Sequence, residues 1–278
     1  MIAGAGQAGY WVAETVRKLR PELEIVLVGD EPVPPYERPP LSKELLTGHA
    51  KPESTWFKSL DYYSENQIDL RLGTRVETVN RADRNVMLSS GVCEPYKTLV
   101  LATGLRPRRL QVQGGDHPRV VTLRTLAEAQ AIRAELGSGK NIVAIGAGFI
   151  GLEVAAVAIK AGCSVTVVEA QQTALERVMA PEVSAALISR HKVSGVSFRF
   201  GDTVSRISDD EGTAYVHLDS GDMIAADLIL VGIGGEPNDD LARNAGIDCD
   251  DGILVGENGL TSDPDIYAVG DVSRQFSV

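Results

Sequence analysis

Short apolar runs alternate with longer segments of helical periodicity along this chain. The runs 24–28, 141–145 and 164–168 are short and rich in β-branched and other apolar residues, which is typical of buried strands in a parallel sheet. After the first glycine-rich turn, helical spacing predicts one apolar helix face that carries Ala8, Val12, Val16 and Leu19. Strands that alternate with helices indicate crossover connections, so the sequence predicts an α/β fold class.

Two glycine-rich turns recur about 140 residues apart. The first is Gly4-x-Gly6-x-x-Gly9, and the second is Gly146-x-Gly148-x-x-Gly151. In this pattern the first glycine permits a tight turn, the second lets the backbone approach a pyrophosphate, and the third lets helix and strand pack closely. The helix that follows offers free N–H groups to the phosphates. The repeat therefore predicts two Rossmann-like dinucleotide-binding units.

An acidic residue ends the strand after each of these helices. Asp30 follows the first such strand, and Glu169 follows the second, where a carboxylate can accept from the hydroxyls of an adenosine ribose. Gln171 and Gln172 stand where an NADPH enzyme would more often place arginine, so the second unit is expected to favour NADH. A structural acid at a strand end is the alternative. These residues alone leave open two NAD sites, or one flavin and one NAD site.

Changes in composition suggest where the two units meet. Residues 105–124 are rich in Arg, Gly, Pro and Gln, a second crossing is expected near 238–246, and 263–271 is expected to return to the first unit. The predicted domains are therefore 1–110 with 245–278, and 111–244. Only three residues precede Gly4, fewer than a central strand of about five, so the natural start is expected to be missing.

Charge and cysteine content exclude several classes of function. The net charge of −11 disfavours nonspecific binding to nucleic acid or anionic membranes. No apolar stretch approaches the roughly 18 to 20 residues of a membrane span, and the start has no basic leader, so a cytoplasmic enzyme is expected. Cys93, Cys163 and Cys249 form no C-x-x-C pair, and no metal site is predicted.

Several motifs together carry a family resemblance. Five prolines lie between 32 and 40, followed by Leu41-Ser-Lys43, and further motifs are 101–104, 146–153, 232–238 and 266–271. In this order they closely resemble the FAD-dependent ferredoxin–NAD(+) reductases that serve ring-hydroxylating dioxygenases and bacterial cytochromes P450. The resemblance covers nearly all 278 residues. It implies a glutathione-reductase-like fold, FAD in the first domain, NADH in the second, and a chain truncated before a C-terminal interface domain.

Glu153 stands out without any family. It is the only charged residue between Phe149 and Ile159, and an unpaired carboxylate is costly in an apolar environment. A helix N-terminus or a cationic partner would stabilise it, whereas an exposed helix face is the alternative. The resemblance implies that Glu153 pairs with Lys43 beside flavin N5. The two are the candidate catalytic residues, in a tuning and positioning role.

The resemblance also supplies the candidate cofactor residues. Val76 is otherwise an ordinary strand residue, and Arg124 is otherwise a solvated loop cation. The full set of cofactor-binding candidates is Gly4, Gly6, Ala8, Gly9, Asp30, Arg38, Lys43, Val76, Thr103, Gly104, Arg124, Gly146, Gly148, Ile150, Gly151, Glu169, Gly232, Gly270 and Asp271.

The resemblance implies hydride transfer from NADH to FAD. Because the chain lacks the dithiol of disulfide reductases, the electrons are expected to leave singly to a [2Fe-2S] ferredoxin or a similar carrier of an oxygenase system. Arg106, Arg108 and Arg109 form either a docking edge for it or a solvated loop. Alternatives are a rubredoxin reductase, an NADH oxidase, and an FAD- and NADH-binding sensor of the apoptosis-inducing-factor type. A homodimer is left open.

Overall fold

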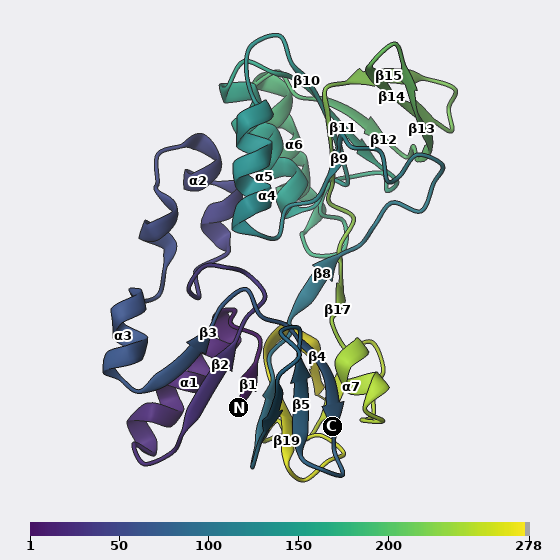
Figure 1. Ribbon diagram of the computed structural model, residues 1–278. Helices are drawn as coiled ribbons and strands as arrows, with labels where there is room; N and C mark the ends of the chain where they lie inside the picture. Colours follow the sequence, from purple (N-terminus) through teal and green to yellow (C-terminus); the bar gives the residue numbers. More distant parts are fainter. Residues whose placement is uncertain (276–278) are drawn as a thin grey trace. The chain divides into compact units, whose positions relative to one another are not determined.

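The computed structural model describes residues 1–275 and confirms the α/β class. Contacts between residues divide the chain into two compact units (Figure 1). Unit 1 comprises Met1–Glu37, Thr55–Arg106 and Glu236–Val278, and unit 2 comprises Arg38–Ser54 and Pro107–Gly235. The chain therefore passes between the units four times.

Unit 1 is built on a five-stranded parallel sheet in the order β19-β7-β1-β2-β3. Its central strand has only two residues, both buried. The strands are β1 (Ile2–Ala3), β2 (Ile25–Val28), β3 (Ile68–Arg71), β7 (Leu99–Leu101) and β19 (Ile266–Ala268). The helices are α1 (Gln7–Leu19), α3 (Leu60–Glu65) and α7 (Asp240–Asn244), with the 3-10 turn η3 (Gly270–Val272). A further 3-10 turn, η2 (Pro52–Thr55), lies where the chain returns to unit 1 at Thr55.

A small antiparallel sheet accompanies the main sheet of unit 1. It is formed by β4 (Val76–Asn80), β5 (Asn85–Leu88) and β6 (Cys93–Pro95), inserted between β3 and β7. Strands β18 (Ile253–Val255) and β20 (Ser273–Gln275) pair in parallel near the end of the described chain. One core cluster joins β4, β5 and β18 to β7 and β19, because their apolar side chains share one buried layer.

Unit 2 repeats this plan in the order β12-β11-β10-β16-β9, again fully parallel. Its strands are β9 (Val120–Val121), β10 (Asn141–Ile145), β11 (Ser164–Glu169), β12 (Ser197–Phe200) and β16 (Leu228–Val231). An antiparallel sheet of β13 (Val204–Asp210), β14 (Thr213–Leu218) and β15 (Met223–Ala226) is inserted before β16. The helices are α4 (Leu126–Glu135), α5 (Phe149–Lys160) and α6 (Pro181–Val193).

The two sheets differ in where their fifth strand comes from. In unit 1 the strand beside β7 is β19, which lies near the C-terminal end, whereas in unit 2 the strand beside β16 is β9, which precedes the unit's central strand. The strands β8 (Leu105–Pro107) and β17 (Gly235–Pro237) pair with each other where the chain passes between the units. The repeated glycine-rich turns therefore belong to two separately built sheets.

Residues 38–54, here called the strap, pack within unit 2 although they interrupt the sequence of unit 1. The strap contains η1 (Pro39–Ser42) and α2 (Glu44–Thr47), which contact α4 and α5. Glu37 and Thr55, the unit 1 residues that flank the strap, lie next to each other, since the Glu37 N–H donates to the Thr55 carbonyl at 2.9 Å. The predicted boundaries had placed this segment in the first domain.

The apolar face predicted for the first helix is shorter than expected. Ala8, Val12 and Val16 pack against the core of unit 1, but Leu19 is 73% exposed, so its assignment to that face was wrong. Leu19 is the last residue of α1, so the packed face ends at Val16. Among residues 1–275, no helix is both long and apolar enough to cross a membrane.

Candidate functional site

The first glycine-rich turn forms a tight backbone cradle in unit 1. Gly4 has φ of +117°, a conformation that residues with a side chain rarely adopt. A Cβ on Gly4 would collide with the carbonyl of Ala102 at the end of β7, and a Cβ on Gly9 would collide with the carbonyl of Gly4. Gly6 is the N-cap of α1, so the free N–H groups of this helix begin at the predicted pyrophosphate position.

A hydrogen-bonded wall stands beside this cradle. Asn238 donates from its side chain to the Thr103 carbonyl at 2.8 Å and from its backbone to the Gly104 carbonyl at 2.9 Å. The Thr103 hydroxyl donates in return to the Asn238 carbonyl at 2.8 Å. These three bonds fix the backbone that follows β7, and sequence analysis did not identify this role of Asn238.

The C-terminal Gly-Asp motif lies against the start of α1. A Cβ on Gly270 would lie 2.7 Å from the Cβ of Ala8, so these two predicted residues are neighbours in unit 1. Gly270 has φ of +74° and begins η3, whose first turn carries the exposed Asp271. The fold of unit 1 thus brings both ends of its sequence to the glycine cradle.

Asp30 and Val76 occupy different environments beyond this cradle. The carboxylate of Asp30 is 57% exposed and lies 3.0 Å from the guanidinium of Arg75, a partner that sequence analysis did not identify. The side chain of Val76 is buried in the core of unit 1. The side chain of Val76 is thus part of the core, which agrees with its alternative interpretation as an ordinary strand residue.

The second cradle has the same construction in unit 2. Gly146 has φ of +102°, and a Cβ there would collide with the carbonyl of Gly232 at the end of β16. A Cβ on Gly151 would collide with the carbonyl of Gly146. Gly148 differs, because its φ is −78° and an added Cβ would meet only the Gly232 carbonyl, at 3.8 Å. The fold does not require glycine at this position, whereas a ligand that approaches the backbone closely does.

Glu169 closes this cradle at the end of β11. One carboxylate oxygen accepts from the Ala147 N–H at 2.6 Å, and the other accepts from the Gln171 N–H at 2.9 Å. The acid is thus oriented by backbone donors on the turn itself. At the start of α5, Phe149 is 52% and Ile150 is 37% exposed, so this end of a mostly buried helix presents apolar surface.

Lys43 and Glu153 meet as the resemblance implied. The ammonium of Lys43 lies 3.0 Å from Oε1 of Glu153 and donates to the Pro39 carbonyl at 3.2 Å. The Ser42 hydroxyl donates to the other oxygen of the same carboxylate. Both partners of Glu153 come from the strap, and Glu153 comes from α5. The carboxylate is paired, so the exposed-face alternative does not describe it.

Two further predicted site residues, Arg38 and Arg124, also contact each other within unit 2. The guanidinium of Arg38 donates to the carbonyl of Arg124, just before α4. The loop that carries Arg124 is organised by Glu128, which accepts from the backbone N–H groups of Arg124 at 2.7 Å and of Thr125 at 2.8 Å. This capping box was missed, although Thr125-x-x-Glu128 is its local sequence signature.

Two arginines of the cationic cluster after β7, Arg106 and Arg108, already have partners within the protein. Arg106 lies 2.6 Å from a carboxylate oxygen of Glu236 and pairs with Asp240 as well. The hydrogen bonds that Arg106 donates to these acids, the one to Glu236 first, raise the pKa of Arg106 above its usual value. Arg108 donates to the Gly235 carbonyl at 3.2 Å. Arg106 is therefore neutralised locally and adds little to a docking edge.

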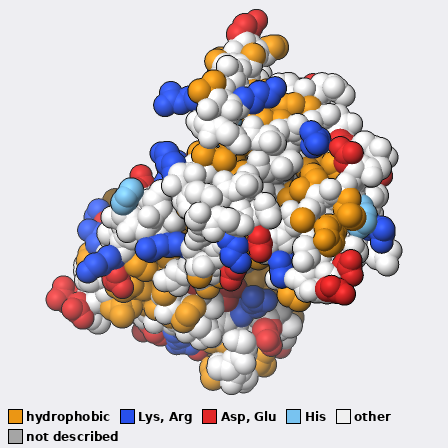
Figure 2. Space-filling model, turned by 90° about the horizontal axis from the view of Figure 1, so that it is seen from above, with side chains coloured by type: hydrophobic (Ala, Val, Ile, Leu, Met, Phe, Trp, Pro, Cys, Tyr) orange, Lys and Arg blue, Asp and Glu red, His pale blue; other side chains and the backbone are white. Residues whose placement is uncertain are grey.

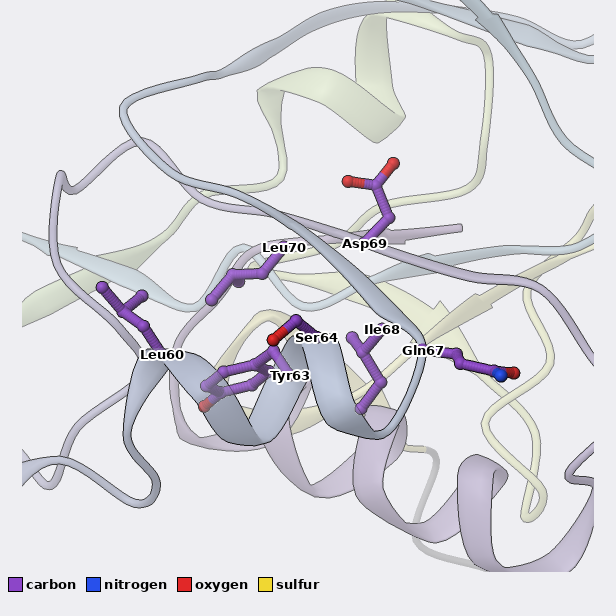
Figure 3. Close-up of a pocket in the computed structure, with 7 residues that line it drawn as sticks. All are labelled: Leu60, Tyr63, Ser64, Gln67, Ile68, Asp69 and Leu70. Atoms are coloured by element: carbon purple, nitrogen blue, oxygen red, sulfur yellow. The ribbon is translucent and has the colours of Figure 1, made fainter.

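One pocket lies apart from these features, between α3 and the edge strand β3 (Figure 3). It contains none of the predicted site residues. Burial raises the pKa of Tyr63, whose hydroxyl has no hydrogen-bond partner within residues 1–275. The lining is Leu60, Tyr63, Ser64, Gln67, Ile68, Asp69 and Leu70.

Comparisons with known proteins agree with this arrangement. Residues 1–277 match the family model described as pyridine nucleotide-disulphide oxidoreductase. The chain is 43% identical to putidaredoxin reductase of Pseudomonas putida, covering 100% of this chain and 67% of that protein. It is 40% identical to the ferredoxin–NAD(+) reductase component of the anthranilate 1,2-dioxygenase system of Burkholderia cepacia, covering 100% and 68%.

A solved structure shows the same fold. The crystal structure of a covalent putidaredoxin reductase–putidaredoxin complex superposes with a TM-score of 0.95 and 43% identity over 99% of this chain and 68% of that chain. The chain thus spans about two thirds of the length of the relatives it matches. The predicted family, the glutathione-reductase-like fold and the two cofactors of the family, FAD and NAD(H), are confirmed.

Proposed function

This chain belongs to the pyridine nucleotide-disulphide oxidoreductase family, and we propose that it takes hydride from NADH onto FAD and passes the electrons singly to a ferredoxin-type carrier. Bound FAD would supply the step from a two-electron donor to a one-electron acceptor. The residues of this chain bind and orient the two nucleotides. A [2Fe-2S] carrier of an oxygenase system and a cytoplasmic location are part of the proposal.

The observation that carries the proposal is the position of Glu153. The helix that begins at the second cradle, α5, has Gly148 as its N-cap and holds Glu153 about one turn later. Glu153 pairs with Lys43, the lysine that the family resemblance assigns to the flavin. A residue implied in flavin chemistry is therefore held by the helix that is expected to bind the pyrophosphate of NADH.

The acids after the two cradles support the assignment of the nucleotides. Glu169 is oriented by backbone N–H groups and keeps lone pairs for the ribose hydroxyls of NADH, while its charge opposes a 2′-phosphate. In unit 1, Gly4, Gly6 and Ala8 would bind FAD through backbone N–H groups at the start of α1, with Asp30 on the ribose.

The proposed acceptor follows from the cysteines of the chain. Cys93 is exposed, Cys163 is buried, Cys249 is half-buried, and all three are free. Disulfide transfer needs two adjacent thiols, so electrons are proposed to leave for an external carrier. On the face shown in Figure 2, acidic and basic side chains are intermixed, so this face offers no broad positive field to an acidic carrier.

An anaerobic titration tests the proposal. The protein is reconstituted with FAD and titrated with NADH and, separately, with NADPH while the flavin absorbance is followed. NADH is expected to reduce the flavin about tenfold or more faster than NADPH, the factor that one charged hydrogen-bonding partner supplies. Addition of an oxidised [2Fe-2S] ferredoxin should then restore the flavin absorbance.

Three results would contradict parts of the proposal. Tight FAD binding without reduction by either nucleotide would favour a binding or sensing module. Reoxidation by rubredoxin and not by ferredoxin would replace the carrier. Equal rates with NADH and NADPH would remove Glu169 as the residue that selects the nucleotide.

A further inference from the structure

The carboxylate of Glu153 has two partners, and the proposed function uses only one of them. Oε1 lies 3.0 Å from the ammonium of Lys43, whereas Oε2 accepts from the hydroxyl of Ser42. Ser42 directly precedes Lys43 and is only 2% exposed. Each oxygen of the carboxylate therefore has its own donor, and both donors come from neighbouring positions in the strap.

The Ser42 hydroxyl has one proton and two acceptors within reach. The carbonyl of Pro39 is 3.5 Å away, at the outer limit of a hydrogen bond, whereas the contact to Glu153 is much closer. A hydrogen bond to an ionised acceptor is also about twice as strong as one to a neutral carbonyl. The proton therefore belongs to the bond with Glu153.

Exposure explains why this hydroxyl matters for Lys43. The side chain of Lys43 is 45% exposed and that of Glu153 is 29% exposed. An ion pair so open to water is worth little by itself, because screening and side-chain entropy oppose a single geometry. A buried hydroxyl on Oε2 removes the rotation of the carboxylate and leaves Oε1 directed at the ammonium.

The backbone of the strap fixes Ser42 before any cofactor binds. Pro39 and Pro40 begin η1 and restrict its φ angles, and Ser42 is the last residue of that turn. The same turn offers the Pro39 carbonyl to the ammonium of Lys43 at 3.2 Å. Lys43 is thus held from two directions by groups whose positions are set by η1 and α5.

We propose that Ser42 is a positioning residue for the reaction: it orients the carboxylate of Glu153, which in turn holds the ammonium of Lys43 at the flavin. The role of Lys43 rests on the proposed function. The contacts among Ser42, Glu153 and Lys43 belong to the protein alone. A serine that only filled space would need no acceptor, and Ser184 shows that case, since it is fully buried and its hydroxyl has no hydrogen-bond partner within residues 1–275.

A double-mutant cycle tests this role in the FAD-loaded protein. Ser42→Ala is expected to slow flavin reduction by NADH about tenfold, the factor for one hydrogen bond to a charged group, with little change in the KM for NADH. Glu153→Ala is expected to slow it at least as much. In the double variant the two losses should not multiply, because Ser42 acts through Glu153. Ser42→Thr keeps the hydroxyl and should recover part of the rate.

Two further measurements do not depend on turnover. The midpoint potential of bound FAD should become more negative in Ser42→Ala, because a less ordered cation stabilises the reduced flavin less. In the apoprotein, acylation of the Lys43 amine followed by mass spectrometry should become several-fold faster, since one hydrogen bond restrains its carboxylate partner. Ser184→Ala should change none of these values.

Specific outcomes overturn the inference. If Ser42→Ala matches Ser184→Ala in rate, potential and acylation, the hydroxyl has no positioning role. If the losses of Ser42→Ala and Glu153→Ala multiply, Ser42 acts independently of Glu153. Wild-type protein that NADH does not reduce would instead contradict the proposed function, while the acylation rates would still decide the role of Ser42.

Discussion

The two glycine cradles are built from the same backbone contacts but are closed by acids held in different ways. In unit 1 the acid is Asp30, which is exposed and paired with Arg75. In unit 2 the acid is Glu169, which is oriented by the N–H groups of Ala147 and Gln171. The two glycine turns thus have the same backbone geometry, whereas the environment of the acid distinguishes the two proposed nucleotide sites.

The walls of the cradles differ as well. In unit 1, Asn238 links the backbone of Thr103 and Gly104 through its side chain and its own N–H. In unit 2 the corresponding wall is Gly232, whose N–H donates to the Ile145 carbonyl at 2.8 Å as part of the sheet. The backbone beside the cradle is therefore held by the Asn238 side chain in unit 1 and by a sheet hydrogen bond in unit 2. Variants at these positions should affect the two sites differently.

The largest effects are expected when the first glycine of either cradle gains a methyl group. Gly4→Ala and Gly146→Ala each place a Cβ against a backbone carbonyl and force an unfavourable φ, at a combined cost of about 2–6 kcal/mol. Gly4→Ala should lose FAD on purification. Gly146→Ala should retain FAD and raise the KM for NADH about 100-fold.

Flavin content by absorbance and steady-state kinetics measure these two effects. Gly137→Ala is the matched control, because an added Cβ there meets nothing within 4 Å. A Gly146→Ala protein that loses FAD and keeps its affinity for NADH would reverse the assignment of the two cradles.

Removal of the acid charge should have a smaller, unequal effect. Glu169→Gln keeps one acceptor for the turn, loses the second and removes the charge, so the KM for NADH should rise about tenfold and discrimination against NADPH should fall. Asp30→Asn should weaken FAD only about threefold, because Arg75 already shares that carboxylate.

Kinetics with both nucleotides and FAD titration by fluorescence measure these changes. Glu135→Gln, an exposed acid at the end of α4, serves as the control for net charge. An unchanged preference for NADH in Glu169→Gln would show that other groups reject the 2′-phosphate.

Substitution of Asn238 should affect only the proposed FAD site of unit 1. Asn238→Ala removes the bond to the Thr103 carbonyl, worth about 1 kcal/mol, so affinity for FAD should fall about fivefold while the KM for NADH stays constant. Equilibrium FAD binding and NADH kinetics measure the two values. A change confined to NADH would contradict the placement of this wall in the flavin site.

The smallest expected effect is the loss of stability in acid. The backbone N–H of Asn141, then Lys140, lowers the pKa of Asp227 in unit 2. Burial opposes ionisation of Asp263 in unit 1, but the Asp265 N–H and Arg81 outweigh it and lower its pKa. Because both folded pKa values lie below the unfolded value of about 3.9, both contributions are complete above that pH and disappear as the pH falls further.

Denaturant unfolding at pH 7 and at about pH 3, followed by hydrogen exchange in each sheet, tests this pH dependence. Asp227→Asn should cost unit 2 about 1 kcal/mol at neutral pH and flatten its loss in acid, and Asp263→Asn should do the same for unit 1. An effect of Asp227→Asn on unit 1 instead would show that the units do not unfold independently.

Local patterns gave the sequence its predictive power. The run 141–145 coincides with β10, and Gly146, Gly148 and Gly151 lie in the predicted turn, because strand, turn and helix are adjacent in the sequence. The contact between Lys43 and Glu153 followed only from the family resemblance. It joins residues 110 positions apart, a separation that periodicity does not describe.

Features that depend on tertiary packing were not predicted. Hydrophobic periodicity placed Leu19 on a buried face, although Leu19 is the last residue of α1 and is 73% exposed. No local signal indicated that the strap packs on α4 and α5, that Ser42 reaches Glu153, or that Arg75 pairs with Asp30. Each depends on which surfaces meet after the two sheets have formed.

The strap also makes one part of this fold modular. It leaves unit 1 after Glu37 and returns at Thr55, and these two residues share a backbone hydrogen bond of 2.9 Å. An insertion with adjacent ends adds little closure entropy to the framework that carries it. The segment that holds Ser42 and Lys43 can therefore vary without a change in the strands of unit 1, and its variation is limited by the contacts that it makes with α4 and α5.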